Sequence, residues 1–311
     1  MSQKIRIGTR GSKLALWQAH HIADLLKTGG LESEIVVIET KGDKILDVAI
    51  AKIGSKGVFT EEIEQQLGEG KIDIAVHSAK DMQSSLPAGF ELIAFTNREM
   101  VNDILLSNNK DINYKDSNRP LTIGTSSTRR IATLRHFYPH IKTVEMRGNL
   151  QTRIGKMESG VCDALMLAYA GAHRMGYDHM ILEELHLDEF TPAVGQGSVA
   201  VEAAVTLDPE LREKIILSCH HVETGYRLEA ERSYLRVLEG GCSIPVFALA
   251  EYSENTIYLK GGIVSLDGQQ RIMHEVSGIP VHATELGQKL ANMVLDSGGD
   301  EILRAIKSNL N

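Results

Sequence analysis

The apolar and polar positions of the first hundred residues follow two alternating patterns. "IRIGTR", "EIVVIET" and "IDIAV" are short apolar runs typical of strands. After Ser12, apolar residues recur at helical spacing, with Trp17 and His21 included in the stripe, until a glycine pair ends the pattern. Because strands alternate with helices, this part of the chain predicts a parallel, doubly wound α/β sheet.

A second alternating set begins near residue 103, and the pattern changes again near residue 222. The later part starts with a long helical stripe, continues with three strands of alternating polarity, and ends with helices near residues 283–296 and 300–307. The sequence therefore predicts two doubly wound α/β lobes resembling periplasmic-binding-protein architecture, followed by a small α+β C-terminal domain. The predicted domains are residues 1–98 with 197–218, residues 102–192, and residues 220–311.

The composition fits a soluble globular protein with several cores. The 311 residues are 42% hydrophobic and carry a net charge of −8, which disfavours nucleic acid as a partner. No apolar run approaches the roughly 20 residues that span a bilayer, and the first residues lack a secretory pattern, so we expect a cytoplasmic protein without a membrane partner. Five of the 16 arginines nevertheless fall between residues 129 and 153, which indicates a site for a small anion.

The three cysteines, Cys162, Cys219 and Cys242, are too far apart in sequence for a CxxC motif. Cys162 leads into an apolar run and is expected to be packed. Cys219 precedes two histidines, but no second cluster accompanies them, so no metal site is predicted. Cys242 lies in "LEGGCSIP", where the glycines favour an exposed bend, and an exposed thiol can act as a nucleophile. Taken alone, however, Cys242 is better explained as a small residue that fills a turn.

Several polar groups directly follow predicted strands, where ligands gather in open α/β sheets. "HSAKD" places Lys80 and Asp81 after the strand "IDIAV". "IGTSSTRR" places Thr125, Ser126 and two arginines where a helix begins, and free amides at such a start attract anions. In "EMRGNLQTR", Gly148 allows a tight turn beside Arg147. A solvated turn and an ordinary helix cap are the plainer interpretations of these motifs.

Taken together, these motifs resemble the porphobilinogen deaminase (hydroxymethylbilane synthase) family over nearly the whole chain. The resemblance rests on "GTRGSKLALWQA", "IDIAVHSAKD", "IGTSSTRR", "RGNLQTR", "PAVGQGSVAVE" and "AERSYLRVLEGGCSIP". It implies a transferase that joins four porphobilinogen molecules head to tail and releases hydroxymethylbilane and ammonia. It further implies a dipyrromethane cofactor in thioether linkage to Cys242, and a protein that works as a monomer.

The resemblance also implies the roles of individual residues. Asp81 matches the catalytic aspartate, which would stabilise the positive charge that develops on pyrrole and transfer protons. The other matches contact cofactor or substrate carboxylates, for which arginines are the best partners. The cofactor-binding set comprises Ser78, Lys80, Thr125, Ser126, Arg129, Arg130, Arg153 and Arg174, and the substrate-binding set comprises Arg10, Lys52, Lys56 and Arg147.

The chain departs from the family pattern at Glu61, Gln83, Asn102 and Thr128, none of which is a predicted catalytic residue. The main alternative is a two-lobed anion-binding protein without catalysis, and a cysteine hydrolase is a third possibility. Ehrlich's reagent, which reacts with pyrroles, would colour a protein that carries the cofactor and leave either alternative colourless.

Overall fold

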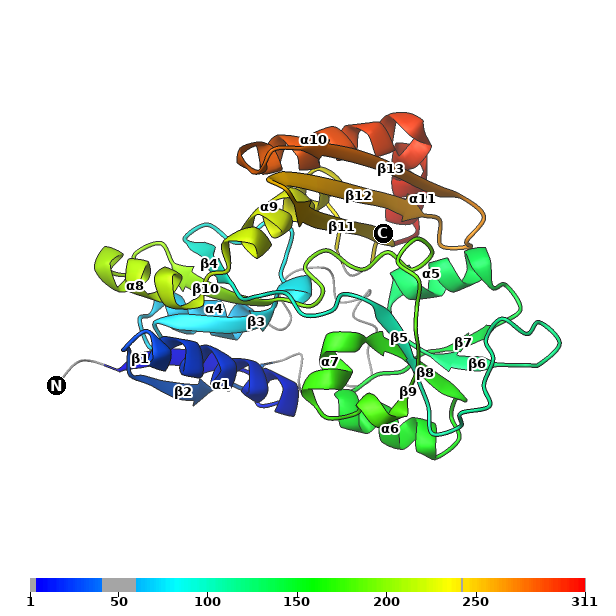
Figure 1. Cartoon of the computed structure of the whole chain (residues 1–311), viewed down its shortest axis with the longest axis horizontal. Coiled ribbons are helices and arrows are strands. Elements are labelled where there is room, and N and C mark those ends of the chain that lie inside the picture. The colour runs from blue at the N-terminus through cyan, green and yellow to red at the C-terminus, as the bar shows by residue number, and fades with distance from the viewer. Residues whose placement is uncertain (1–3, 41–59, 242, 311) are drawn as a thin grey trace. The chain divides into compact units, whose positions relative to one another are not determined.

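The computed structural model describes residues 4–40, 60–241 and 243–310 (Figure 1). Two predicted site residues, Lys52 and Lys56, and the predicted anchor Cys242 lie outside these described residues. The described chain divides into two compact units. The first contains residues 4–40, 60–99 and 197–225, and the second contains residues 100–196 and 226–310 without residue 242.

The first unit is built on a five-stranded sheet with the order β2-β1-β3-β10-β4. β1, β2 and β3 are parallel, and β10 is antiparallel to both of its neighbours. Helices α1 and α8 pack on one face and α4 on the other, so the sheet is covered on both sides as the alternation predicts. The elements are β1 (Ile5–Thr9), α1 (Lys13–Thr28), β2 (Ser33–Val37), α4 (Glu61–Gly68), β3 (Ile74–Ser78), β4 (Phe90–Phe95), β10 (Val199–Ala204) and α8 (Pro209–Cys219).

The first helix shows where the sequence pattern was right and where it was wrong. Ser12 caps α1 by accepting a hydrogen bond from the amide of Ala15 at 3.2 Å, as expected. The buried stripe is rotated from the predicted one, however, and includes Gln18 rather than Trp17 or His21. Trp17 and His21 are partly exposed and stack on each other with ring centroids 5.3 Å apart.

The second unit contains a sheet with an equivalent order, β7-β6-β8-β5-β9. β6, β7 and β8 are parallel, and β5 is antiparallel to β8 and β9. Helix α5 packs on one face, and α6 and α7 pack on the other. The elements are β5 (Asp103–Leu106), β6 (Thr122–Gly124), α5 (Thr128–Phe137), β7 (Lys142–Val144), α6 (Leu150–Glu158), β8 (Ala164–Ala168), α7 (Tyr169–Arg174) and β9 (Ile181–Glu184).

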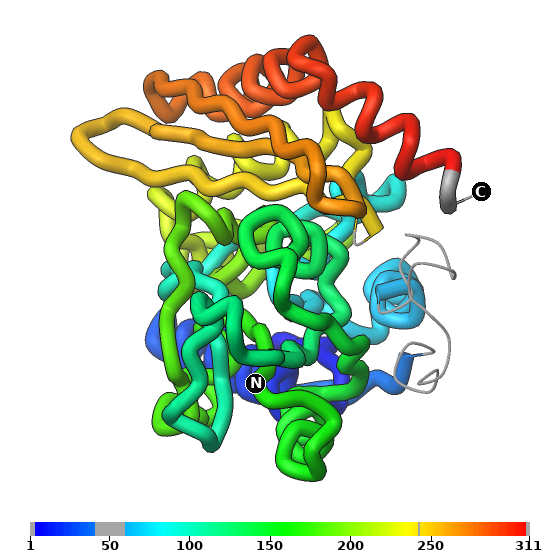
Figure 2. The backbone as a smooth tube through the Cα atoms, turned by 90° about the vertical axis from the view of Figure 1, so that its right-hand side faces the viewer, coloured from blue at the N-terminus to red at the C-terminus, as the bar shows by residue number. Residues whose placement is uncertain are grey.

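The last part of the second unit is an antiparallel meander with helices on one face. The sheet order is β11-β12-β13, and α10 lies along it in both views (Figures 1 and 2). This arrangement confirms the predicted α+β C-terminal domain. The elements are α9 (Val222–Val237), β11 (Val246–Ser253), β12 (Thr256–Val264), β13 (Arg271–Gly278), α10 (Ala283–Val294) and α11 (Asp300–Leu310).

The turn between β12 and β13 packs against helix α5 of the same unit. Arg135 and His136, at the end of α5, bond the carbonyl oxygens of Leu266 and Gly268 at 2.6 Å each. The guanidinium of Arg271 lies 5.3 Å from the ring centroid of Phe137. These contacts fix the C-terminal end of the helix whose N-terminal end carries Arg129 and Arg130.

Candidate active site

In the first unit, predicted site residues gather where β1 and β3 end. The two strands are parallel neighbours, so Arg10, which follows β1, and Ser78, which ends β3, share one edge of the sheet. Gln18 of α1 donates a hydrogen bond to the hydroxyl of Ser78 at 2.8 Å. Lys80 and Asp81 follow in a short 3-10 turn.

Asp81 is exposed, and none of the described residues is hydrogen bonded or ion paired to its carboxylate. It therefore differs from Asp73, at the opposite end of β3, whose carboxylate is held by the backbone amide and guanidinium of Arg6 at 2.7–3.0 Å. A carboxylate without a partner keeps its charge and its acceptor atoms available for another group.

In the second unit, the predicted residues gather at the carboxyl ends of β6, β7 and β8. Thr125 follows β6, Arg147 follows β7, and Arg174 ends the helix that follows β8. Because these strands are parallel neighbours, Thr125 and Arg147 lie at the same edge of the sheet, whereas Arg174 lies at the far end of α7, the helix that leaves this edge. Thr125 is buried, whereas Arg147 and Arg174 are partly exposed.

Ser126 joins two of these strand ends. Its hydroxyl donates to the carbonyl oxygen of Met146 at 2.8 Å and accepts from the Met146 amide at 3.0 Å. The cap of α5 is instead made by Ser127, which accepts from the amide of Arg130. Ser127 therefore makes the ordinary helix cap, and Ser126 fixes the neighbouring loop.

The loop after β7 turns sharply at Gly148. This glycine has a φ of +109°, and an added Cβ would lie 2.7 Å from the side chain of Thr152, so the tight turn predicted there is present. Asn149 caps α6, and Arg153 donates from Nε to the carbonyl oxygen of Gly148 at 2.8 Å. The turn thus orients Arg153, whereas the guanidinium of Arg147 is ion paired with Glu145, to which its Nε donates at 2.8 Å.

Arg129 and Arg130 are almost completely buried, with 5% and 6% of their surface exposed. Both bind the carboxylate of Asp103, Arg129 at 2.8 Å and Arg130 at 2.7 Å. The Nε of Arg129 is buried and has no hydrogen-bond partner in the described chain. Sequence reasoning placed both arginines in the site but missed Asp103, whose one signal was a charged residue at the start of the apolar run "DILL".

Two cysteines are packed inside the units. Cys162 is 6% exposed, and burial raises the pKa of its thiol, as expected for a residue that leads into a strand. Burial raises the pKa of the Cys219 thiol to about 12. Both thiols are therefore poor nucleophiles near neutral pH. In the described part of the chain, no group of three or more His, Cys, Asp or Glu side chains could hold a metal.

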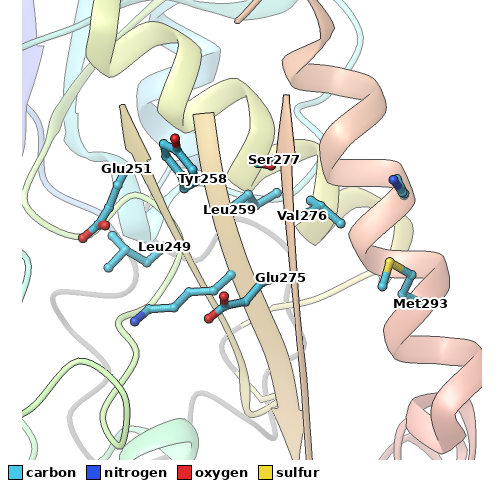
Figure 3. Close-up of a pocket in the computed structure, with 10 residues that line it drawn as sticks. Leu249, Glu251, Tyr258, Leu259, Glu275, Val276, Ser277 and Met293 are labelled. Carbon is cyan, nitrogen blue, oxygen red and sulfur yellow. The ribbon is translucent and has the colours of Figure 1, made fainter. Parts of the chain in front are cut away.

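A pocket of about 590 Å³ lies on the C-terminal sheet and contains none of the predicted residues (Figure 3). Glu251 of β11 and Glu275 of β13 line it together with Tyr258. Lys260 and Lys289 line the same pocket and balance these two carboxylates, and the lining contains no arginine, so the pocket is separate from the arginine-rich anion site that the sequence indicates.

Comparison with known proteins identifies the family. The family model described as "Porphobilinogen deaminase, dipyromethane cofactor binding domain" matches residues 5–212, and the model of the "Porphobilinogen deaminase, C-terminal domain" matches residues 226–296. The chain belongs to the porphobilinogen deaminase family. This family comprises hydroxymethylbilane synthases, which are transferases of tetrapyrrole biosynthesis, and the assignment favours catalysis over the non-catalytic alternative.

Relatives of similar length match from end to end. The porphobilinogen deaminase of Cytophaga hutchinsonii is 57% identical over 310 residues, covering 100% of this chain and 99% of the relative. That of Desulfosudis oleivorans is 53% identical and covers 98% of both chains. Among solved structures, the chain is similar to the periplasmic VFT2 domain of Bordetella pertussis BvgS, with 16% identity over 68% of this chain and 84% of that one. Its TM-score of 0.41 is too low to support an argument.

Proposed function

We propose that this protein carries out the porphobilinogen deaminase reaction with Cys242 as the cofactor anchor and Asp81 as the catalytic carboxylate. Porphobilinogen is the substrate, and four molecules are joined head to tail before hydroxymethylbilane is released with ammonia. When bound, the dipyrromethane supplies the pyrrole carbon on which the chain grows. The protein's own residues bind carboxylates, hold the reacting groups in place and move protons.

The donors of the second unit match the chemistry of a dipyrromethane. Each of its pyrroles carries an acetate and a propionate, and a buried carboxylate needs cationic or amide donors. The Nε of Arg129 is a buried donor without a partner, and it belongs to a residue in the first turn of α5, whose free amides attract anions. This donor, in the unit that also carries Thr125, Arg147 and Arg174, is the observation on which the proposal chiefly rests.

Arg10, Ser78 and Lys80 are proposed as further contacts in the first unit. Lys52 and Lys56, outside the described residues, remain proposed substrate contacts on the basis of the resemblance alone. Asp81 is exposed and unpaired among the described residues, so its charge is available to stabilise a pyrrole cation and its oxygens to accept a proton.

Intact-protein mass tests the anchor. Protein purified from cells that make porphobilinogen should weigh more than its 311 residues by two joined pyrrole units. Brief exposure to porphobilinogen should then add discrete steps of one pyrrole unit. The Cys242→Ala variant should show neither, whereas Cys162→Ala and Cys219→Ala, which change buried thiols, should show both. An unmodified wild-type mass, or a ladder that persists in Cys242→Ala, would refute this anchor.

A conservative change tests the catalytic carboxylate. Asp81→Asn should keep the fold and the primer mass but lose on the order of 10²–10³ in turnover, because it removes one charge-stabilising group. Asp73→Asn, which changes a carboxylate at the opposite end of β3, is the matched control and should keep normal turnover. Normal turnover in purified Asp81→Asn would remove Asp81 from this role.

We further propose that the protein has three domains, that it is a monomer and that it is cytoplasmic. The second unit contains two separate sheets, each with its own core. This supports its division into one domain of residues 102–192 and another of residues 220–311. No helix of the described chain is long and apolar enough to cross a membrane. Size-exclusion chromatography with light scattering would test the monomer, since a dimer would double the mass of 34.2 kDa.

A further inference from the structure

Asp103 is a fully buried carboxylate at the edge of the second unit where the predicted site lies. It is the first residue of β5, and it pairs with Ala168, the last residue of β8, because the two strands are antiparallel. This register places a negative charge beside the carboxyl end of β8, at the sheet edge where Thr125 follows β6. Its side chain has no exposed surface.

Each oxygen of Asp103 holds one arginine. Oδ2 accepts from the guanidinium of Arg129 at 2.8 Å. Oδ1 accepts from Arg130 twice, from Nε at 3.1 Å and from a terminal nitrogen at 2.7 Å. Both arginines therefore have a fixed ionic partner although they lie 26 and 27 residues away in the sequence.

A second bond to the backbone fixes each guanidinium. Arg129 also donates to the carbonyl oxygen of Thr191 at 2.9 Å, and Arg130 donates to that of Met166 at 3.0 Å. A planar guanidinium held at two points cannot rotate freely. The remaining donor atoms of these side chains, including the unpartnered Nε of Arg129, consequently point in set directions.

The charges of this cluster do not cancel. Burial alone would raise the pKa of Asp103, but the charges and hydrogen bonds of the two arginines outweigh burial and hold the pKa well below its usual range. Asp103 is therefore ionised at neutral pH, and two guanidinium groups with one carboxylate leave a net charge of +1. One further carboxylate would neutralise the cluster, and the donor that is still unpaired belongs to Arg129.

Gln196 ties the cluster to the segment that returns to the first unit. Its side-chain amide donates to Oδ1 of Asp103 at 2.9 Å and to the carbonyl oxygen of Val101 at 2.7 Å. The "PAVGQG" segment thus contributes a third residue that donates to Asp103, after Arg129 and Arg130. Oδ1 is saturated by Arg130 and Gln196, while Oδ2 serves Arg129 alone.

We propose that Asp103 is a positioning residue for primer binding: its buried carboxylate sets the two guanidinium groups of Arg129 and Arg130 so that they receive a carboxylate of the dipyrromethane. This inference rests on the proposed function, because it takes the arginines as primer contacts. It adds a residue that touches no ligand itself and acts only through the arginines. An alternative role, in which Asp103 merely stabilises the fold, leads to different results in the following experiment.

The experiment compares Asp103→Asn and Asp103→Glu with Asp73→Asn. Asp73 is a fair control because it also holds an arginine in bidentate geometry, with bonds of 2.7 and 3.0 Å to Arg6, and no predicted site residue contacts it. Each protein is purified from cells that make porphobilinogen. Primer occupancy is read from intact mass, KM and kcat from turnover of porphobilinogen, and stability from urea unfolding.

Wild type and Asp73→Asn should carry primer in full. Asp103→Asn should carry about tenfold less, because neutralising the central carboxylate releases both guanidinium groups from their set directions. Asp103→Glu keeps the charge but moves the carboxylate by one methylene in a fully buried site, so it should fold with some loss of stability and raise KM about fivefold with a smaller change in kcat.

The outcomes separate the inference from the proposed function. If wild type carries no primer, the proposed function fails. If wild type carries primer and Asp103→Glu has full primer and the wild-type KM, the positioning role is overturned, even if Asp103→Asn does not fold. If Asp103→Asn folds and carries as much primer as Asp73→Asn, the role is overturned as well.

Discussion

Gly124 is the last residue of β6 and directly precedes the site residues Thr125 and Ser126. The core around it leaves no room for a larger side chain at this position. A Cβ added at Gly124 would lie 2.8 Å from Sγ of Cys162, 2.9 Å from a methyl of Leu165 and 3.0 Å from the terminal methyl of Met146. All three neighbours are buried. Gly124→Ala therefore cannot be accommodated without displacing core atoms.

The expected magnitude follows from two opposing effects. Overpacking a core by one methyl costs about 1–3 kcal/mol, and replacing a strand glycine by alanine recovers about 0.5–1 kcal/mol of backbone entropy. The Met146 methyl is the end of a flexible side chain and can move, whereas Cys162 and Leu165 are held within the core of β8 and α6. We expect Gly124→Ala to lower the free energy of unfolding by about 1–2 kcal/mol.

Urea unfolding with a matched control provides the assay. Gly155 lies on the exposed face of α6, and an added Cβ there meets no atom within 4 Å. Gly155→Ala should raise the free energy of unfolding by about 0.5–1 kcal/mol, because alanine is the better helix former. Replacing glycine by alanine should thus lower the free energy of unfolding at position 124 and raise it at position 155.

A double variant tests the cause directly. Cys162→Ala removes the sulfur atom nearest to the new methyl, so the Gly124→Ala/Cys162→Ala protein should be more stable than the sum of the two single changes by about 1 kcal/mol. A coupling energy of zero, or a Gly124→Ala protein at least as stable as wild type, would refute the packing argument.

Two further predictions concern buried carboxylates. Burial raises the pKa of Glu64, a hydrogen bond from Thr60 offsets part of the shift, and Glu202 adds to it. The folded state therefore binds this proton more tightly than the unfolded state, and stability falls as pH rises through the folded pKa. Glu64→Gln should thus be more stable than wild type at pH 8 by on the order of 1 kcal/mol, with no such gain near pH 4; an equal gain at both pH values in urea unfolding would contradict this. Glu231 is fully buried and accepts from the amides of Gly195 at 2.9 Å and Ala250 at 2.8 Å. Glu231→Gln should lower the free energy of unfolding by about 2–3 kcal/mol, because the new NH₂ group cannot accept a hydrogen bond from one of these amides. Hydrogen exchange at that amide should become faster. A loss of stability below about 0.5 kcal/mol would contradict this explanation.

The elements and most of the proposed site residues could be predicted from the sequence because their signals are local. Strands and helices show their period within ten residues, and turn glycines such as Gly148 mark a backbone angle that other residues resist. Residues that directly follow parallel strands must lie at one edge of the sheet, which is how Thr125 and Arg147 were placed. The family motifs extended that placement to Arg10 and Arg174.

Tertiary structure alone decided which charges meet. Asp103, Arg129 and Gln196 come from three separate segments, and no local pattern links one to another. Their pairing exists because β5 runs antiparallel to β8 and so brings a buried carboxylate to the edge of the sheet near the start of α5. A buried charge requires a partner, but the local sequence does not say which distant residue provides it. The antiparallel placement of β5 and β10 depends on non-local pairing in the same way. The sequence by itself therefore determined the elements and the kinds of side chain at the site. Only the fold decided that Arg129 and Arg130 share one carboxylate, which leaves the cluster with a net charge of +1.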